Sequence, residues 1–126
     1  MPIDFEYIEE KNILDLKVSG VLKSEEIVEY FQKILDGGFL KPEFIEIVDL
    51  NAATDFVLRY SDLNSIADQT LQLNQIGQKV TLMCVYNVKS KDISAMMLPL
   101  YKKACFEFLI CNSELEKSTY LSKLIE

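Results

Sequence analysis

The sequence of 126 residues predicts an α/β domain with a mainly parallel sheet and the element order ββαβαβαβα. Two observations carry this prediction. From residue 23 onward, short apolar segments alternate with segments of helical periodicity. Before them, 4–9 and 13–19 alternate apolar and polar residues around a turn, which predicts an N-terminal antiparallel hairpin. One core suits this length, so we expect a single domain spanning 1–126.

Two amphipathic helices are predicted in the first two thirds of the chain. The first spans 23–38 with Ser24 as its N-cap, and the second spans 60–77 with Ser61 as its cap and Gly77 as its stop. Their apolar residues recur at helical spacing and predict one buried face each. The residues expected to face inward are Ile27, Phe31, Ile34 and Leu35 in the first helix, and Leu63, Ile66, Ala67, Thr70 and Leu73 in the second.

Two further helices are expected near the C-terminus. The segment 90–104 carries a regular apolar stripe interrupted by Pro99, which should kink the helix or mark a late start. The segment 113–126 begins with a capping box from Ser113 to Glu116.

Three apolar segments, 44–50, 79–86 and 106–111, are predicted strands. The segment 79–86 is apolar on both parities, which predicts a strand buried on both faces.

The charge balance excludes several classes of partner. With 13 basic and 20 acidic residues, the net charge is −7, which disfavours binding to nucleic acid or to an anionic bilayer surface. A charge-free apolar run of about 18 residues and a signal-peptide pattern are both missing, so we expect a cytoplasmic protein without a transmembrane segment.

The residue types that are missing argue against an enzyme. The chain has no histidine, which removes Ser-His-Asp and Cys-His nucleophile pairs and His-based zinc sites. Its four glycines form none of the common phosphate-binding loops. Cys84, Cys105 and Cys111 are expected to pack in the interior, because an extended 105–111 segment would hold its two cysteines roughly 20 Å apart. We therefore expect no catalytic residue, cofactor or metal.

Five segments in this order resemble the STAS domains (sulfate transporter and anti-sigma-factor antagonist), and more closely their sporulation-antagonist-like branch. The segments are VSGVLKSEEIVEYFQKIL, FIEIVDLNAA, YSDLNSIADQ, KVTLMCVY and FEFLICNSELEKSTYL, and the resemblance spans 4–124. It implies a non-enzymatic domain that makes regulatory protein–protein contacts or binds a small ligand, sometimes a lipid.

The resemblance also bears on Ser61. In the phosphorylated branch a serine lies at the start of the helix after the third strand, in an Asp-Ser-Ser-Gly-like motif. The matching segment here is RYSDL, so Ser61 falls near that place but the motif is absent. This departure favours relatives that share the fold without the phosphorylation switch.

A polar segment after the third predicted strand is the first candidate site. Asp49, Asn51, Thr54 and Asp55 are expected in a loop at the carboxyl end of the sheet, where ligands bind in open α/β folds. The alternative is a loop whose Asn and Asp side chains make local turn bonds. The segment is also similar to the Asp-x-Asp-x-Thr loop of haloacid-dehalogenase-type phosphotransferases, but Asn51 cannot replace the second carboxylate as an acid and base.

Arg59, the chain's only arginine, and Ser61 follow this segment. Arg59 is expected either to bind a carboxylate or phosphate or to form a surface ion pair. Ser61 is expected to cap the helix, with or without a second role as a phosphorylation site.

The exposed face predicted for the helix 63–77 is short of charge. Asp68 is the only charged residue from Leu63 to Gln78. Because charge is depleted where proteins meet, we hypothesise that this face binds a partner or a second copy in a homodimer. The residues expected there are Asn64, Gln69, Gln72, Asn74 and Gln75.

Met96 and Met97, beside Pro99, allow a further interpretation. They are expected either to belong to the core or to line an adaptable apolar pocket for an acyl chain. The sequence thus favours a non-enzymatic interaction module that acts through the third-strand loop and the following helix. The alternative is a domain that binds or senses a small apolar ligand such as a lipid.

Overall fold

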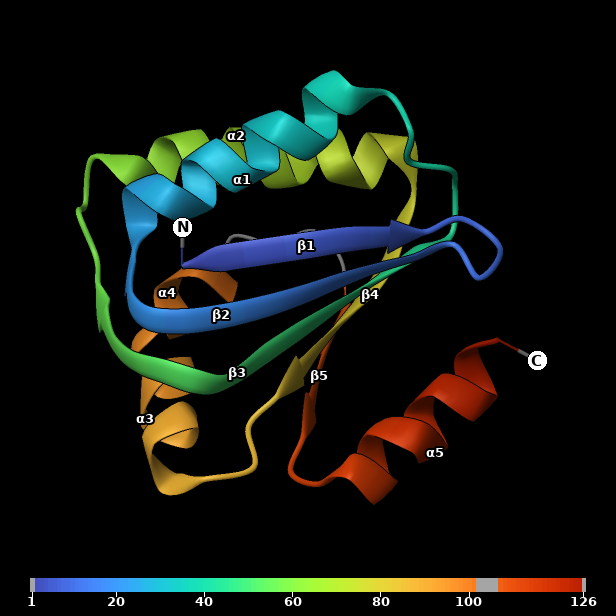
Figure 1. Cartoon of the computed structure of the whole chain (residues 1–126). Helices are drawn as coiled ribbons and strands as arrows, with labels where there is room; N and C mark the ends of the chain where they lie inside the picture. The colour runs from blue at the N-terminus through green and yellow to red at the C-terminus, as the bar shows by residue number, and fades with distance from the viewer. Residues whose placement is uncertain (1, 102–106, 126) are drawn as a thin grey trace.

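The computed structural model describes residues 2–101 and 107–125. Its elements follow the predicted order, with the third helix divided in two (Figure 1). They are β1 (Ile3–Ile8), β2 (Ile13–Lys23), α1 (Ser24–Gly37), β3 (Phe44–Val57), α2 (Asp62–Ile76), β4 (Gln78–Cys84), α3 (Val88–Met96), α4 (Leu98–Tyr101), β5 (Glu107–Cys111) and α5 (Glu114–Leu124). The break before α4 lies beside Pro99, as predicted.

The five strands form one mixed sheet in the order β1-β2-β3-β4-β5. β1 pairs with β2 as the predicted antiparallel hairpin, and the other three pairings are parallel. β4 is buried on both faces, as its sequence predicted. The α/β fold class with a mainly parallel sheet and an N-terminal hairpin is therefore confirmed.

Helices cover the two faces of the sheet unequally. α1 and α2 lie side by side across one face, while α5 lies on the other side (Figure 1). The larger apolar core lies between the sheet and α1, α2, α3 and α4, and it includes Leu14, Leu16, Val18, Ile27, Phe31, Ile34, Ile66, Leu73, Ile93, Met97 and Leu100. The smaller core packs under α5 and includes Ile13, Ile45, Ile47, Val80, Leu82, Cys84 and Cys111.

The expected packing of the cysteines is observed for two of the three. Cys84 and Cys111 are free thiols in the smaller core, and burial raises the pKa of each, that of Cys111 to about 12. Cys105 lies outside the described residues. Within the described residues, no helix is long and apolar enough to span a membrane.

The predicted loop at Asp49–Asp55 is wrong, because β3 continues to Val57. β2 continues beyond Lys17, the residue that pairs with Asp49. Its residues from Ser19 to Lys23 pair in parallel with the continuation of β3. The register shifts beside Gly20, whose φ of 69° suits glycine. Within residues 2–101 and 107–125 the strand order does not reverse, so the described sheet has no switch point of the kind at which ligands bind in open α/β sheets.

The predicted cap at Ser24 is wrong, and the predicted cap at Ser61 is right in position but not in its capping bond. Lys23, not Ser24, occupies the N-cap of α1, and its backbone N–H donates to Glu26 Oε1 over 2.9 Å. Ser61 occupies the N-cap of α2 but makes no side-chain capping bond. Its backbone is helical, with φ −61° and ψ −20°, instead of the extended conformation in which a hydroxyl reaches the first-turn N–H groups.

A carboxyl group lies inside the larger core. Glu46 is 5 % exposed, and its oxygens accept hydrogen bonds from the Tyr30 hydroxyl at 2.6 Å and the Thr81 hydroxyl at 2.8 Å. Gln78 Nε2 donates in turn to Thr81 Oγ1 over 2.7 Å. Burial raises the pKa of Glu46 even though these hydrogen bonds oppose the rise. The buried Tyr30 hydroxyl also has a raised pKa, so this pair favours its neutral form.

We predict that Glu46→Gln changes the pH dependence of stability. The unfolded chain releases the Glu46 proton near pH 4.3, roughly, whereas the folded protein holds it to higher pH. The stability of the wild type should therefore fall as pH rises through this window, and the neutral amide should abolish that fall. Urea unfolding between pH 4 and 8 measures this difference. The free energy of unfolding of the variant relative to wild type should rise by about 1.4 kcal/mol for each pH unit in which Glu46 is ionised only in the unfolded chain.

The same substitution at the exposed Glu29 of α1 provides the control, since it removes a carboxylate that lies outside the buried cluster. A stability difference between Glu46→Gln and wild type that stays constant or shrinks with rising pH would contradict this prediction.

Candidate functional site

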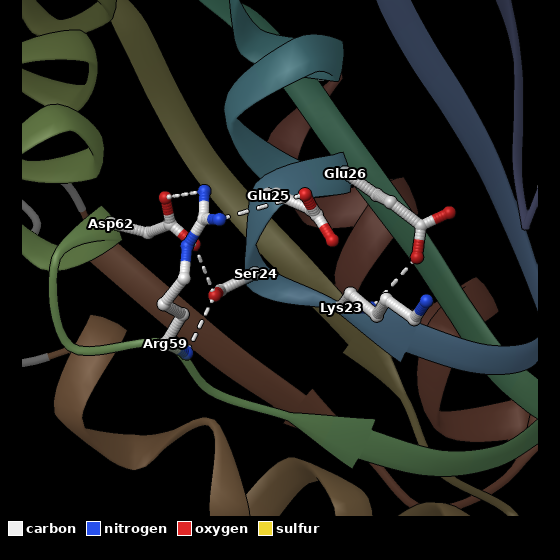
Figure 2. A network of polar contacts seen from close by, with 6 residues as sticks. All are labelled: Lys23, Ser24, Glu25, Glu26, Arg59 and Asp62. Carbon is white, nitrogen blue, oxygen red and sulfur yellow. Dashed lines mark hydrogen bonds and ion pairs between the residues drawn. The ribbon is translucent and has the colours of Figure 1, made fainter.

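Ser24, Arg59 and Asp62 join the starts of α1 and α2 in a cluster that we call the α1–α2 corner (Figure 2). Arg59 donates to the two oxygens of Asp62 through Nε at 3.1 Å and Nη2 at 2.9 Å. The Ser24 hydroxyl donates to Asp62 Oδ2 over 2.6 Å and accepts from the Arg59 backbone N–H over 2.8 Å. Arg59 Nη1 also lies 3.8 Å from a carboxylate oxygen of Glu25.

The electrostatics of the corner show that Arg59 is already engaged. The hydrogen bonds from Arg59 have the largest effect on Asp62 and hold its pKa below the usual value. The hydrogen bond from the Ser24 hydroxyl has the next largest effect in the same direction. Asp62 in turn raises the pKa of Arg59. The Asp62 side chain is buried, whereas that of Arg59 remains 61 % exposed. The arginine therefore positions α2 against α1, and it reaches solvent with only part of its guanidinium.

Asp49 and Asn51 belong to a second cluster, which ties β3 to the end of β4 and the start of α3. Asp49 Oδ1 accepts from the backbone N–H and the side-chain amide of Asn51, at 2.9 and 2.7 Å. Asn51 Oδ1 accepts from the Tyr86 N–H at 2.6 Å and the Ser90 hydroxyl at 3.2 Å. Asn87 donates to the Asn51 carbonyl and caps α3 through the Ser90 N–H. These bonds occupy the Asn51 side chain.

The sequence analysis did not identify Tyr86, Asn87 or Ser90 as members of this cluster. The segment Asn87–Ser90 matches the pattern of an N-cap with a polar partner three residues later, which could have located the start of α3. Nothing local in the sequence indicates that Asn51 lies beside it, since that contact depends on how β3 and β4 pair.

Thr54 and Asp55 are exposed on the β3 continuation, where Asp55 pairs with Val21 of β2. Asp55 Oδ1 accepts from the adjacent Phe56 N–H over 2.8 Å. The structure therefore does not gather the predicted polar residues into one pocket.

The outward face of α2 carries a nearly uncharged strip. Its exposed residues recur every three or four positions and form what we call the α2 stripe: Ser61, Asn64, Ser65, Asp68, Leu71, Gln72 and Gln75. Leu71 is 47 % exposed, and Tyr60, which precedes the stripe, is 78 % exposed. Asn74 is also exposed but lies to the side of the stripe.

The prediction that Gln69 belongs to this exposed face is wrong. Gln69 is 5 % exposed, and its Nε2 donates to the Val28 carbonyl of α1 over 3.0 Å. Its position beside the buried Thr70 turns it toward α1, which packs along α2. It therefore links the two helices and is not available on the surface.

An apolar cavity of about 60 Å³ lies between the sheet and the helices of the larger core. Its walls include Leu16, Val18, Ile66, Met83, Met97 and Leu100, with Glu46, Tyr30 and Thr81 as polar neighbours. Met97 is 6 % exposed and lines it, as the pocket interpretation required. Met96 is 42 % exposed and does not, so its predicted place in a pocket is wrong. Benzene occupies an engineered cavity of about 150 Å³, so this volume is too small for an acyl chain.

Metal binding finds no support among residues 2–101 and 107–125, where no three cysteine, aspartate or glutamate side chains gather closely enough to hold an ion.

We predict that Arg59→Gln raises the pKa of Asp62 toward its ordinary value of about 3.9. The charged guanidinium provides the largest stabilisation of the Asp62 carboxylate, and glutamine removes it. Because a lowered folded pKa stabilises the protein above the unfolded pKa and this is lost on acidification, the variant should lose less stability between neutral and acid pH. Carboxyl ¹³C NMR titration measures the change directly.

Lys41→Gln is the matched control, because Lys41 forms an exposed ion pair with Glu9 away from the corner. An Asp62 pKa that is the same in wild type and Arg59→Gln would show that the contacts of the corner do not persist in solution.

Comparisons with known proteins identify the fold. No family model matches the chain, and no curated protein matches it. Among solved structures, it is similar to an uncharacterised DUF3478-family protein with a SpoIIAA-like fold from Shewanella loihica PV-4, with TM-score 0.56, 18 % identity, and coverage of 94 % of this chain and 91 % of that one. A sulfate transporter family protein from Wolinella succinogenes gives TM-score 0.57 and 9 % identity over 90 % and 88 % of the two chains.

The anti-sigma factor antagonist SpoIIAA in its unphosphorylated form is also similar, with TM-score 0.55 and 10 % identity over 96 % of this chain and 97 % of that one. Each of the three similarities covers at least 90 % of this chain. As the sequence resemblance predicted, the chain has the SpoIIAA-like fold of STAS-like domains.

Proposed function

We propose that the protein is a non-enzymatic regulatory module that binds a protein partner or a second copy through the α2 stripe and the β3–α2 connection. The observation that carries this proposal is the stripe itself, an exposed helix face with one charge and an exposed leucine. The fold is consistent with such a role, since one structure that shares it is an anti-sigma factor antagonist.

Other helices of the same protein show what a solvated face looks like. α1 exposes Glu25, Glu29 and Lys33, and α5 exposes Glu114 and Lys123. The α2 stripe has amides and hydroxyls at the corresponding positions. Removing charges from water costs more than removing amides that find new hydrogen-bond partners, so the α2 stripe is the helix face best suited to be covered.

The connection into α2 adds an aromatic contact residue. Tyr60 is 78 % exposed directly before Ser61, and Val57 at the end of β3 is 50 % exposed. Tyrosine is enriched at protein interfaces because it provides a large apolar surface with one polar group. We include Tyr60, Arg59 and Ser61 in the proposed contact surface.

The polar clusters give little support to an enzymatic role. Arg59 bonds Asp62 in the α1–α2 corner, and the side chains of Asp49 and Asn51 bond each other and their neighbours. Catalysis needs an acid, base or nucleophile placed to meet a substrate, and these groups instead hold elements of the fold together.

We predict that a photo-crosslinking amino acid at Gln72 forms a covalent adduct in cells that make the protein, because the α2 stripe faces its partner. Leu115 on α5 is 77 % exposed and provides the matched position on another face. Denaturing electrophoresis and mass spectrometry should detect a discrete adduct from position 72 but not from position 115. Equal adducts from both positions, or none from position 72, would contradict the proposed function.

A second candidate function is the binding of a small apolar molecule in the cavity beside Glu46. The cavity favours it, although its volume restricts the ligand to a few heavy atoms. Under xenon pressure, the methyl ¹³C signals of Met83 and Met97 should shift, whereas that of the exposed Met96 should not. Unshifted Met83 and Met97 signals would exclude an accessible cavity, and a bare mass in native mass spectrometry would argue against a resident ligand.

A further inference from the structure

We propose that the α2 stripe binds the stripe of a second copy, with the two α2 helices antiparallel across a twofold axis beside Leu71. This inference rests on the proposed function and names the partner. α2 has 15 residues, so each helix would contribute a contact line of about 22 Å.

The chemistry of the α2 stripe suits pairing with itself. A twofold interface brings the same surface of both copies together, so a charged face meets its own charge near the axis. Amides avoid this repulsion, because each carries both a donor and an acceptor. The stripe has amides at Asn64, Gln72 and Gln75, and its one charge, Asp68, lies away from Leu71 by almost one turn.

An axis between positions 71 and 72 gives a complementary register. It places Leu71 of each copy beside Leu71 of the other, so that two side chains now 47 % exposed become covered. It also places Asp68 opposite Gln75 of the second copy, where the amide N–H can donate to the carboxylate. Each complementary pair occurs twice, once on each side of the axis.

The exposed face of α1 is less suitable for this arrangement. Its first turns carry Glu25 and Glu29, and a twofold contact there would oppose carboxylates with few cations to balance them. A contact along one helix is also short, and small interfaces are typical of weak, reversible association.

Charge changes at two positions test the register. Gln75→Glu should weaken the dimer at least about fivefold, because it places a carboxylate opposite Asp68, and Gln75→Lys should strengthen it. The double variant Asp68→Lys with Gln75→Glu should restore dimerisation, because the lysine introduced at position 68 of one copy then faces the carboxylate introduced at position 75 of the other. Asn74→Asp adds the same charge as Gln75→Glu beside the stripe and should leave the dissociation constant unchanged.

Sedimentation equilibrium between 1 and 500 µM measures the constant for each variant, with circular dichroism confirming the fold. Monomeric wild type across this range would overturn the inference, as would a double variant no tighter than Gln75→Glu alone. Either result leaves the proposed function standing if position 72 crosslinks to a different protein. A failure of position 72 to crosslink at all would instead remove the proposed function itself.

Discussion

The strand order is the constraint on which the rest of the structure depends. The parallel crossovers all advance in one direction, from β2 through β3 and β4 to β5. Right-handed crossovers that advance in one direction place their helices on the same face of the sheet. α1 and α2 are therefore brought side by side, and each covers one flank of the other (Figure 1). The outer face of α2 is left exposed, and the order of the described strands contains no reversal.

The close approach of α1 and α2 also explains the hydrogen-bond partners of two buried polar side chains on α2. Asp62 becomes buried at the start of α2 and needs both Arg59 and Ser24 to satisfy its carboxylate. Gln69 becomes buried halfway along the helix and bonds the α1 backbone. Asn51, Arg59 and Gln69, three of the candidate site residues, thus serve to join elements. What remains for function is the surface of α2, where charge is scarce and Leu71 is exposed.

The sequence predicted the element order, the hairpin, the buried faces and the break at Pro99, because these follow from local periodicity and proline geometry. It did not predict that β3 runs to Val57, because the continuation depends on the length of β2. The exposed position predicted for Gln69 and the capping bond predicted for Ser61 were wrong for a similar reason. Helical periodicity marks the apolar face, but it does not show that a polar residue will be buried by a neighbouring helix, or that the first turn begins in a helical conformation.

If the α2 stripe is the surface through which this module associates, dilution should change the surroundings of that surface. A dilution series followed by ¹H–¹⁵N NMR detects this change, because each backbone amide reports on its own surroundings. We expect the concentration-dependent shifts to gather on residues 61–75, with α5 unaffected. Shifts that are absent, or that gather on α5 or the β1 edge, would contradict it.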